Sequence, residues 1–274
     1  MMNIYDCFMY FDEDLLLDLR LNTLNKYVNK FVIAEATYTH NGSKKELKFD
    51  IANFKKFQDK ITYIVVDEPP PNILSLKKNE PKHVRGEKLI LNGMARDYFQ
   101  RENLYKGLTK TQENDLIMIS DLDEIPSKNK VKFITNCDLN EVAPVAFEQN
   151  LFHLNCNYLN LERWIGTIAF TKKYIDKFKP QEFRNARYKI SCLVNAGWSF
   201  SSFGSNEKIN EKFNAFAHDE FNLEKYKEAN HIKKCKEQGV DLFHRNIKKR
   251  KISKEFFPKD LLSIMEKNSN FYFG

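Results

Sequence analysis

The stretch Asp115-Leu-Ile-Met-Ile-Ser-Asp-Leu-Asp-Glu-Ile-Pro126 indicates both a fold class and a place for a ligand. Its uninterrupted apolar run, 116–119, leads into three acids within four positions, Asp121, Asp123 and Glu124. A short apolar run with polar or turn-forming residues at both ends is typical of a strand buried on both faces, as in a parallel sheet. Open α/β sheets bind their ligands beyond the carboxyl ends of such strands. The acids are therefore expected where a protein of this class holds its ligand.

Asp121 and Asp123 form an Asp-x-Asp motif at the end of this strand. In an extended segment, residues i and i+2 point the same way, so both carboxylates are expected on one side and Leu122 on the other. Like charges held together repel unless a cation or a proton lies between them. The plain alternative is a solvated acidic turn without a function, because short motifs often match by chance. The rest of the chain has to decide between the two.

The segments before this strand alternate between strand and helix patterns. Residues 4–11, 31–34 and 61–66 are short apolar runs typical of strands. Apolar residues recur at helical spacing in 12–28 and 84–108. Strand, helix and strand in succession predict a parallel sheet, and no linker interrupts the 274 residues. We therefore expect one α/β domain spanning the chain, 1–274, with the tail beyond 245 least defined.

The second half of the chain carries shorter and more mixed patterns. The stretch 195–204 combines aromatic and small residues and is expected to be a loop that faces a substrate. The other elements expected are helices at 51–60, 127–136, 171–179, 206–216 and 223–237 and strands at 144–153, 157–161 and 163–170.

Composition excludes several classes of protein. With 42% hydrophobic and 30% charged residues the chain is globular and not disordered. The net charge of +7 suits a phosphorylated ligand or an anionic membrane surface, and no zinc-finger or RNA-binding signature supports nucleic acid as a partner. Five widely spaced cysteines without a Cys-x-x-Cys motif indicate free thiols in a reducing compartment. No signal peptide or transmembrane run is visible, so a cytoplasmic location, with peripheral membrane contact as an option, is expected.

Several motifs, in order along the chain, resemble those of glycosyltransferase family 17. The resemblance extends from about residue 4 to about residue 245. The segments that carry it are Tyr5–Leu24, Phe31–Glu35 with Thr39, Gly42 and Lys45, Gln100-Arg101, Gly107-Leu108, Ser120–Pro126, Ala196–Ser201, Lys212, Phe216–Glu220 and Gly239–Arg245. One departure is Ser199, which stands where the family pattern has histidine after a Gly-Trp pair.

The resemblance implies a GT-A-type fold, a Rossmann-like and mainly parallel central sheet flanked by helices. It also implies a metal-dependent, inverting glycosyltransferase with a UDP-sugar donor, most simply UDP-N-acetylglucosamine, and a glycan acceptor on an oligosaccharide, glycoprotein or glycolipid. The activity known in the family is transfer of N-acetylglucosamine in β-1,4 linkage to a mannose of an N-glycan core. The implied cofactor is a divalent metal, Mn²⁺ or Mg²⁺.

Residues for the metal and the donor follow from the matching motifs. The metal ligands expected are Asp121, Asp123 and His218, since a hard cation takes oxygen ligands and bridges carboxylate to phosphate. His218 is alternatively a base or a structural histidine. The donor contacts expected are Asp6, Glu35, Lys45, Arg101 and Asp121. Arg101 suits a diphosphate as a planar donor, with a salt bridge to a nearby acid as the equal alternative.

An inverting transferase also needs a base to take the proton of the acceptor hydroxyl. The candidates are Glu124, Asp219, Glu220 and Asp241, although strand alternation points Glu124 away from the two aspartates.

On the acceptor side, Trp198 and Ser199 are the residues expected to meet the sugar. Packing in the core is the equal alternative for Trp198, and Trp164 is expected to lie in the core.

Three other functions remain open at this point. A metal-dependent phosphohydrolase or nucleotidyl transferase could use the same carboxylates. The second is a glycan- or nucleotide-binding module without catalysis. The third is nucleic-acid binding, which is supported by the net charge alone. The sequence predicts no oligomeric state.

Overall fold

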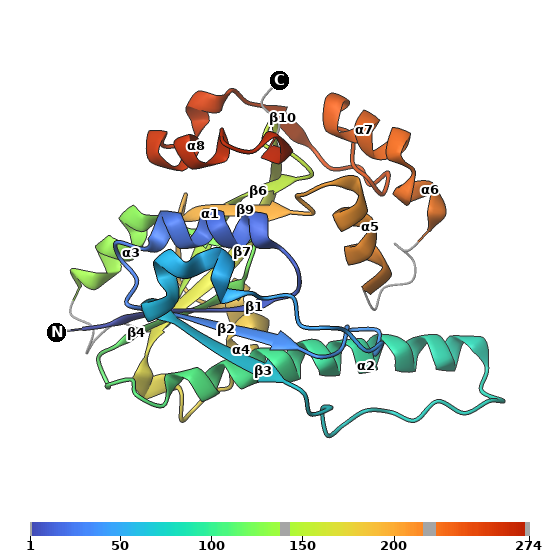
Figure 1. Cartoon of the computed structure of the whole chain (residues 1–274), viewed down its shortest axis with the longest axis horizontal. Helices are drawn as coiled ribbons and strands as arrows, with labels where there is room; N and C mark the ends of the chain where they lie inside the picture. Colours follow the sequence, from blue (N-terminus) through green and yellow to red (C-terminus); the bar gives the residue numbers. More distant parts are fainter. Residues whose placement is uncertain (1, 138–142, 216–222, 272–274) are drawn as a thin grey trace.

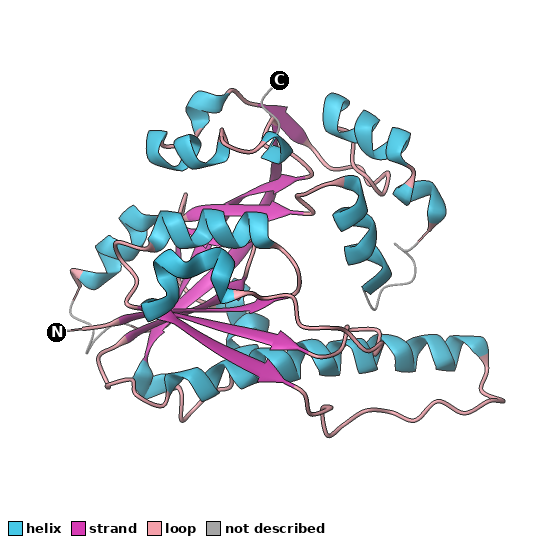
Figure 2. Ribbon diagram, viewed as in Figure 1, coloured by secondary structure: helices cyan, strands magenta, loops and turns pink. Residues whose placement is uncertain are grey.

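The computed structural model describes residues 2–137, 143–215 and 223–271. One sheet lies at its centre, with helices on both faces (Figures 1 and 2). The strands are β1 (Ile4–Tyr10), β2 (Lys30–Ala36), β3 (Ile61–Val66), β4 (Leu116–Asp121), β5 (Glu124–Pro126), β6 (Val145–His153), β7 (Tyr158–Thr171), β8 (Cys192–Leu193), β9 (Gly197–Ser201) and β10 (Lys249–Lys251).

The helices are of two kinds, α-helices and 3-10 helices. The α-helices are α1 (Asp14–Leu24), α2 (Lys82–Glu102), α3 (Lys128–Thr135), α4 (Pro180–Ala186), α5 (Asn206–Ala215), α6 (Glu224–Lys227), α7 (Ala229–Gln238) and α8 (Lys259–Met265). The 3-10 helices are η1 (Ile51–Lys60), η2 (Asn103–Leu108), η3 (Lys172–Tyr174), η4 (Arg187–Lys189), η6 (Lys254–Phe256) and η7 (Ser269–Phe271). None of the helices in the described ranges has the length and apolar character that a bilayer span requires.

The first half of the chain builds the parallel part of the sheet. Its strands lie in the order β3-β2-β1-β4, and each neighbouring pair is parallel. Beyond β4 the order continues β7-β6-β9-β5, where β7 runs antiparallel to both β4 and β6. The expected GT-A-type architecture, a Rossmann-like sheet flanked by helices, is therefore confirmed, and the later strands make the sheet mixed.

Strand alternation divides the interior into two cores, one on each face of the sheet. On one face Phe8 of β1 packs with Leu16 of α1, in a cluster that also contains residues of α8. On the opposite face Cys7 packs with Leu104 of η2 and Phe183 of α4. In Figure 1 α1 and α2 accordingly lie on opposite sides of β1 and β2. Because side chains alternate along a strand, the face on which a polar residue lies decides which helix it meets.

Four of the expected elements differ from the structure. The two strands expected at 157–161 and 163–170 are one strand, β7, which carries a bulge. Within the expected helix 171–179 only η3 is helical. The loop expected at 195–204 was wrong, because β9 lies at its centre with four of its five residues buried.

Gly197 explains how β9 comes to lie so close to β5. It has φ of 149° and pairs with Pro126 of β5. A Cβ at this position would lie 2.3 Å from the carbonyl oxygen of Ile125. Glycine is required for both reasons, so the Gly-Trp pair is first of all a strand-packing feature.

Candidate functional site

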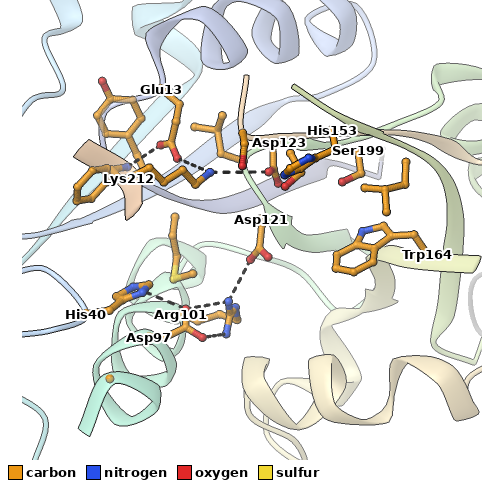
Figure 3. Close-up of a pocket in the computed structure, with 18 of the residues that line it drawn as sticks. Glu13, His40, Asp97, Arg101, Asp121, Asp123, His153, Trp164, Ser199 and Lys212 are labelled. Atoms are coloured by element: carbon orange, nitrogen blue, oxygen red, sulfur yellow. Dashed lines mark hydrogen bonds and ion pairs between the residues drawn. The ribbon is translucent and has the colours of Figure 1, made fainter. Parts of the chain in front are cut away.

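A cavity of about 920 Å³ opens where the parallel strands end. Tyr10 at the end of β1, Ala36 at the end of β2 and Asp121 at the end of β4 line it. Residues of β7 and β9, among them Trp164 and Ser199, line it as well (Figure 3). Its size is near the top of the range of about 300–1,000 Å³ for small-molecule sites. The acids of the Asp-x-Asp motif therefore lie where ligands of open α/β sheets bind.

Arg20 of α1 holds the backbone of the acidic turn, residues 121–124, in place. Its guanidinium is fully buried and donates hydrogen bonds to the carbonyl oxygens of Asp121 at 2.8 Å, Leu122 at 3.0 Å and Glu124 at 3.1 Å. Its other edge is bound by both carboxylate oxygens of Asp6, at 2.8 and 2.6 Å. Asp6, expected to contact the donor, is fully buried and does not line the cavity. It instead neutralises the arginine that holds the turn, as a buried charge requires.

Asp121 lies between two guanidinium groups. Its Oδ1 is 3.0 Å from Nη2 of Arg101 on α2, and its Oδ2 is 2.7 Å from Nη2 of Arg184 on α4. Burial by itself would raise the pKa of the Asp121 carboxyl, but Arg184 and Arg101 outweigh burial and hold this pKa well below its usual range. Asp121 is therefore ionised at neutral pH. Arg184 was not predicted from the sequence.

Asp123 has the opposite electrostatic character. Burial raises its pKa to about 7; Lys212 opposes the rise, and the negative charges of Glu124, Asp121 and Glu13 add to it. Lys212 Nζ lies 4.0 Å from Oδ2 of Asp123 and 3.3 Å from Oε1 of Glu13.

The two aspartates do not share one side. In Figure 3 Asp121 points towards Arg101, and Asp123 lies towards Lys212. The expectation of a common side was wrong because β4 ends at Asp121 and the chain turns at Leu122. Both side chains nevertheless line the cavity.

The pair nonetheless suits a divalent cation. Within 2–137, 143–215 and 223–271, no three His, Cys, Asp or Glu side chains group in a way that could hold a metal ion. Mg²⁺-like ions, however, commonly use one or two carboxylates and complete their shell with water and substrate phosphate. The pKa of Asp123 is raised first by burial and then by the negative charges of its neighbours, and a bound cation would offset both effects. His218, the third expected ligand, lies outside the described residues.

Of the other residues expected to contact the donor, two line the cavity and one is buried away from it. Arg101 and Lys45 line the cavity. Arg101 also pairs with Asp97 at 3.0 Å and donates to the side chain of Gln181, so its guanidinium is held in place. Glu35 is fully buried away from the cavity lining. It forms an ion pair with Lys45 and accepts bonds from the loop backbone at 48 and 49, which makes it an anchor of the loop after β2.

Two of the expected bases are committed to arginines. Glu124 is fully buried, pairs with Arg184 at 2.8 Å and accepts the backbone N–H of Asp121 at 2.9 Å. Asp241 is buried and pairs with Arg245 at 2.8 Å. Neither carboxylate lines the cavity. The other two candidates, Asp219 and Glu220, lie outside the described residues.

Of the two alternatives for Trp198 the structure shows packing in the core, and the core position expected for Trp164 was wrong. Trp198 is 8% exposed, belongs to the core next to α1 and does not line the cavity. Trp164 lines the cavity, and its Nε1 donates to Oε1 of Glu124 at 3.0 Å. Ser199 lines the cavity as expected, although it is buried. On β9 the side chains alternate, so a cavity-facing Ser199 places Trp198 on the core side.

His153, which the sequence did not single out, also lines the cavity at the end of β6. Burial, assisted by the charge of Lys249, lowers its pKa to about 3. Its imidazole is therefore neutral at physiological pH. A lone histidine at the end of a mixed strand carries no motif, so the sequence offered no signal for it.

Comparison with known proteins identifies the family. The model of glycosyltransferase family 17 matches residues 1–269. The β-1,4-mannosyl-glycoprotein 4-β-N-acetylglucosaminyltransferases of Homo sapiens and Rattus norvegicus are each 27% identical over 136 residues, 48% of this chain and 23% of theirs. The match thus spans less than a quarter of the length of these curated relatives.

Solved structures resemble the chain more distantly. HddC from Yersinia pseudotuberculosis has 12% sequence identity and a TM-score of 0.36, with 72% of this chain and 92% of that one covered. Glucosyl-3-phosphoglycerate synthase from Mycobacterium tuberculosis, in complex with Mn²⁺, UDP and phosphoglyceric acid, has 12% identity and a TM-score of 0.35, with 76% and 73% covered. Because the family model matches almost the whole length of this chain, the chain belongs to glycosyltransferase family 17.

Proposed function

We propose that the protein is a metal-dependent, inverting glycosyltransferase that moves N-acetylglucosamine from UDP-N-acetylglucosamine to a hydroxyl of a glycan. The observation that carries the proposal is the cavity at the carboxyl ends of β1, β2 and β4, where Asp121 and Asp123 lie between Arg101 and Lys212. Membership of family 17 supports the reaction class. The names of the curated relatives support this choice of sugar.

The charges around the turn suit a sugar diphosphate. Arg101 and Lys212 approach the acidic turn from different sides, and each is held by a second acid, Asp97 and Glu13 respectively (Figure 3). Burial would lower the pKa of Lys212, but Glu13 and Asp123 outweigh burial and raise it, so the ammonium stays charged. Cations fixed before the ligand arrives stabilise charge that develops on a leaving diphosphate without further reorganisation.

Asp123, with Asp121 beside it, is the proposed metal seat. A divalent ion bound there supplies Lewis-acid stabilisation of the departing diphosphate. Arg184 and Arg101 keep Asp121 ionised and fix its orientation, while Arg20 holds the backbone of the turn. The base role stays with Asp219 and Glu220, because Glu124 and Asp241 are engaged by arginines away from the cavity.

The deciding experiment measures UDP release, with and without Mn²⁺, from UDP-N-acetylglucosamine, UDP-glucose and UDP-galactose. Asp123→Asn keeps the size of the side chain and removes its charge. We expect it to lower kcat/KM by about 10²-fold or more, as loss of a central electrostatic group does. Asp59→Asn is the matched control, because it makes the same change at an exposed position outside the cavity lining.

Two results would contradict this function. One is the absence of turnover for every donor, and the other is full activity of Asp123→Asn. Release of UMP, with the sugar left on its phosphate, would mean that water cleaves the diphosphate bond and would indicate a phosphohydrolase instead.

A further inference from the structure

An irregular strand pairing shapes the wall of the cavity opposite the parallel strands. Gln149 of β6 pairs with Trp164 of β7, and Leu151 of β6 pairs with Asn160 of β7. The two pairs are two residues apart on β6 but four residues apart on β7. The three residues of β7 between these pairs, 161–163, are exposed and lie opposite a single residue of β6. The side chain of Asn160 accepts the backbone N–H of Glu162 at 2.9 Å. Bulges of this kind redirect side chains and are frequent beside functional sites.

The bulge brings an aromatic ring and polar groups to the same wall. Asn160, Glu162 and Trp164 all line the cavity, and so does Tyr188, which is 48% exposed. Glu162 is an exposed carboxylate. An aromatic ring next to a few hydrogen-bonding groups is the usual lining of a small-molecule site.

Trp164 is held in a fixed orientation. Its indole N–H donates to Glu124, and the same carboxylate is bound by Arg184 at 2.8 Å. The Arg187 guanidinium lies 5.6 Å from the centre of the indole ring and does not line the cavity. The ring is therefore supported by protein groups outside the cavity and presented to it, so little side-chain freedom is lost on binding.

This wall lies away from the part of the cavity where a nucleotide would be expected to bind. The ends of β1 and β2 form the other wall, which is where open α/β sheets bind nucleotides. In Figure 3 Trp164 and Arg101 lie on different sides of Asp121, with His40 beyond Arg101. A donor whose diphosphate meets Arg101 would place its transferred sugar near Asp121, which leaves Trp164 for the molecule that receives it.

We propose that Trp164, Tyr188 and Glu162 form the subsite for the acceptor sugar, a neutral hexopyranose. The flat indole suits the C–H face of a pyranose ring, and the Glu162 carboxylate suits the sugar hydroxyls, since bonds to an ionised acceptor are the stronger ones. The term acceptor rests on the proposed transferase function. Sugar binding at this wall does not.

The chain offers a direct test because it contains only two tryptophans. Trp198→Phe leaves Trp164 as the sole indole, and Trp164→Phe leaves the core residue Trp198. Tryptophan emission of the wild type and both variants is followed during titration with methyl α-D-mannopyranoside, methyl β-D-galactopyranoside and N,N′-diacetylchitobiose, each with and without UDP. We expect a saturable change with at least one sugar in the wild type and in Trp198→Phe, and no change in Trp164→Phe.

A third variant, Glu162→Gln, tests the polar half of the subsite. Loss of the charged acceptor should weaken sugar binding by about tenfold, the effect of one charge-assisted hydrogen bond. Glu113→Gln is its matched control, an exposed acid outside the cavity lining. Circular dichroism establishes that each variant is folded. If Trp198→Phe does not fold, the difference between wild type and Trp164→Phe gives the same signal.

Two outcomes would overturn the subsite. One is that no sugar changes the emission of the wild type under either condition. The other is that the Trp164→Phe variant responds as strongly as the wild type. Failure of the proposed function is a separate result, because UDP release is measured as hydrolysis, in which water takes the sugar in place of the acceptor. A sugar response without UDP release would reject the transferase and keep the sugar site, and the reverse pattern would reject the subsite alone.

Discussion

At the scale of single residues, the acids of the sequence divide into those that face the cavity and those that support it. Asp121 and Asp123 line the cavity, whereas Asp6, Glu35 and Glu124 are fully buried and neutralise or anchor neighbouring groups. The motifs mark both kinds alike, because a buried ion pair constrains residue type as strongly as a ligand does. Only the position of the partner, for example Arg20 next to Asp6, separates them.

His153 gives a pH dependence of stability whose sign follows from its environment. Its pKa is about 3 in the folded protein and about 6.5 in the unfolded chain. Between these values the unfolded state binds the extra proton, so stability falls as pH decreases through this window. The slope due to this group is up to about 1.4 kcal/mol per pH unit. His153→Gln should therefore lose less stability than the wild type between pH 7 and about 4.5, measured by urea unfolding.

The control for this prediction is His83→Gln, which makes the same change at an exposed position. Its stability should follow the wild-type pH profile. A profile of His153→Gln that is parallel to the wild type would show that the pKa of His153 is the same in the folded and unfolded states.

At the scale of elements, two glycines should respond in opposite directions to the same substitution. At Gly197 an added Cβ would lie 2.3 Å from the Ile125 carbonyl oxygen, and φ is 149°. Gly86 lies in α2, and an added Cβ there would meet nothing within 4 Å. We expect Gly86→Ala to stabilise the protein by about 0.5–1 kcal/mol, the helix preference for alanine. Gly197→Ala should destabilise it by about 1–3 kcal/mol through strain and overpacking.

Thermal unfolding of both variants provides the measurement, and each serves as the control of the other. A Gly197→Ala variant as stable as the wild type would mean that β9 can move away from β5 without cost. The Gly-Trp motif would then require a different explanation from strand packing.

The strands also show which parts of the fold can be predicted from the sequence. The strands β1, β3 and β4 were predicted almost to the residue, because each is a short and mainly apolar run. Of the three, β1 and β4 are almost fully buried, whereas β3 lies at the sheet edge and is only partly buried. The strand β9 was taken for a loop, since its alternation of Trp198 with two serines hides a strand whose polar face lines a cavity. The bulge in β7 was equally invisible, because it depends on the register with β6.

Several residues that the motifs singled out do line the cavity. They are Asp121 at the end of β4, Asp123 in the turn after it, Arg101 on α2 and Lys45 in the loop after β2, and the roles expected for them stay predictions. Arg184 and Trp164 reach the site from segments without a distinctive pattern, and long-range packing alone brings them there.

At the scale of the whole molecule, the two halves of the chain share one sheet and the core beside α1. Strand β4 pairs with β7 from Leu116↔Thr171 to Ile119↔Ile168, which joins the parallel half to the mixed half. The core beside α1 contains Phe8 from the first half and Trp198 and Met265 from the second. Neither half could separate without exposing this core and an unpaired strand edge.

We therefore expect the chain to unfold in urea as a single cooperative unit, despite a length at which intermediates become common. In the Trp164→Phe variant the emission of Trp198 reports on the shared core, and far-UV circular dichroism reports on the helices of both faces. The two transitions should coincide in midpoint and slope. If the helical signal changes well before the Trp198 emission, the helices of one face unfold independently. The cavity would then lie between two separately stable parts, and the donor and acceptor walls could move relative to each other.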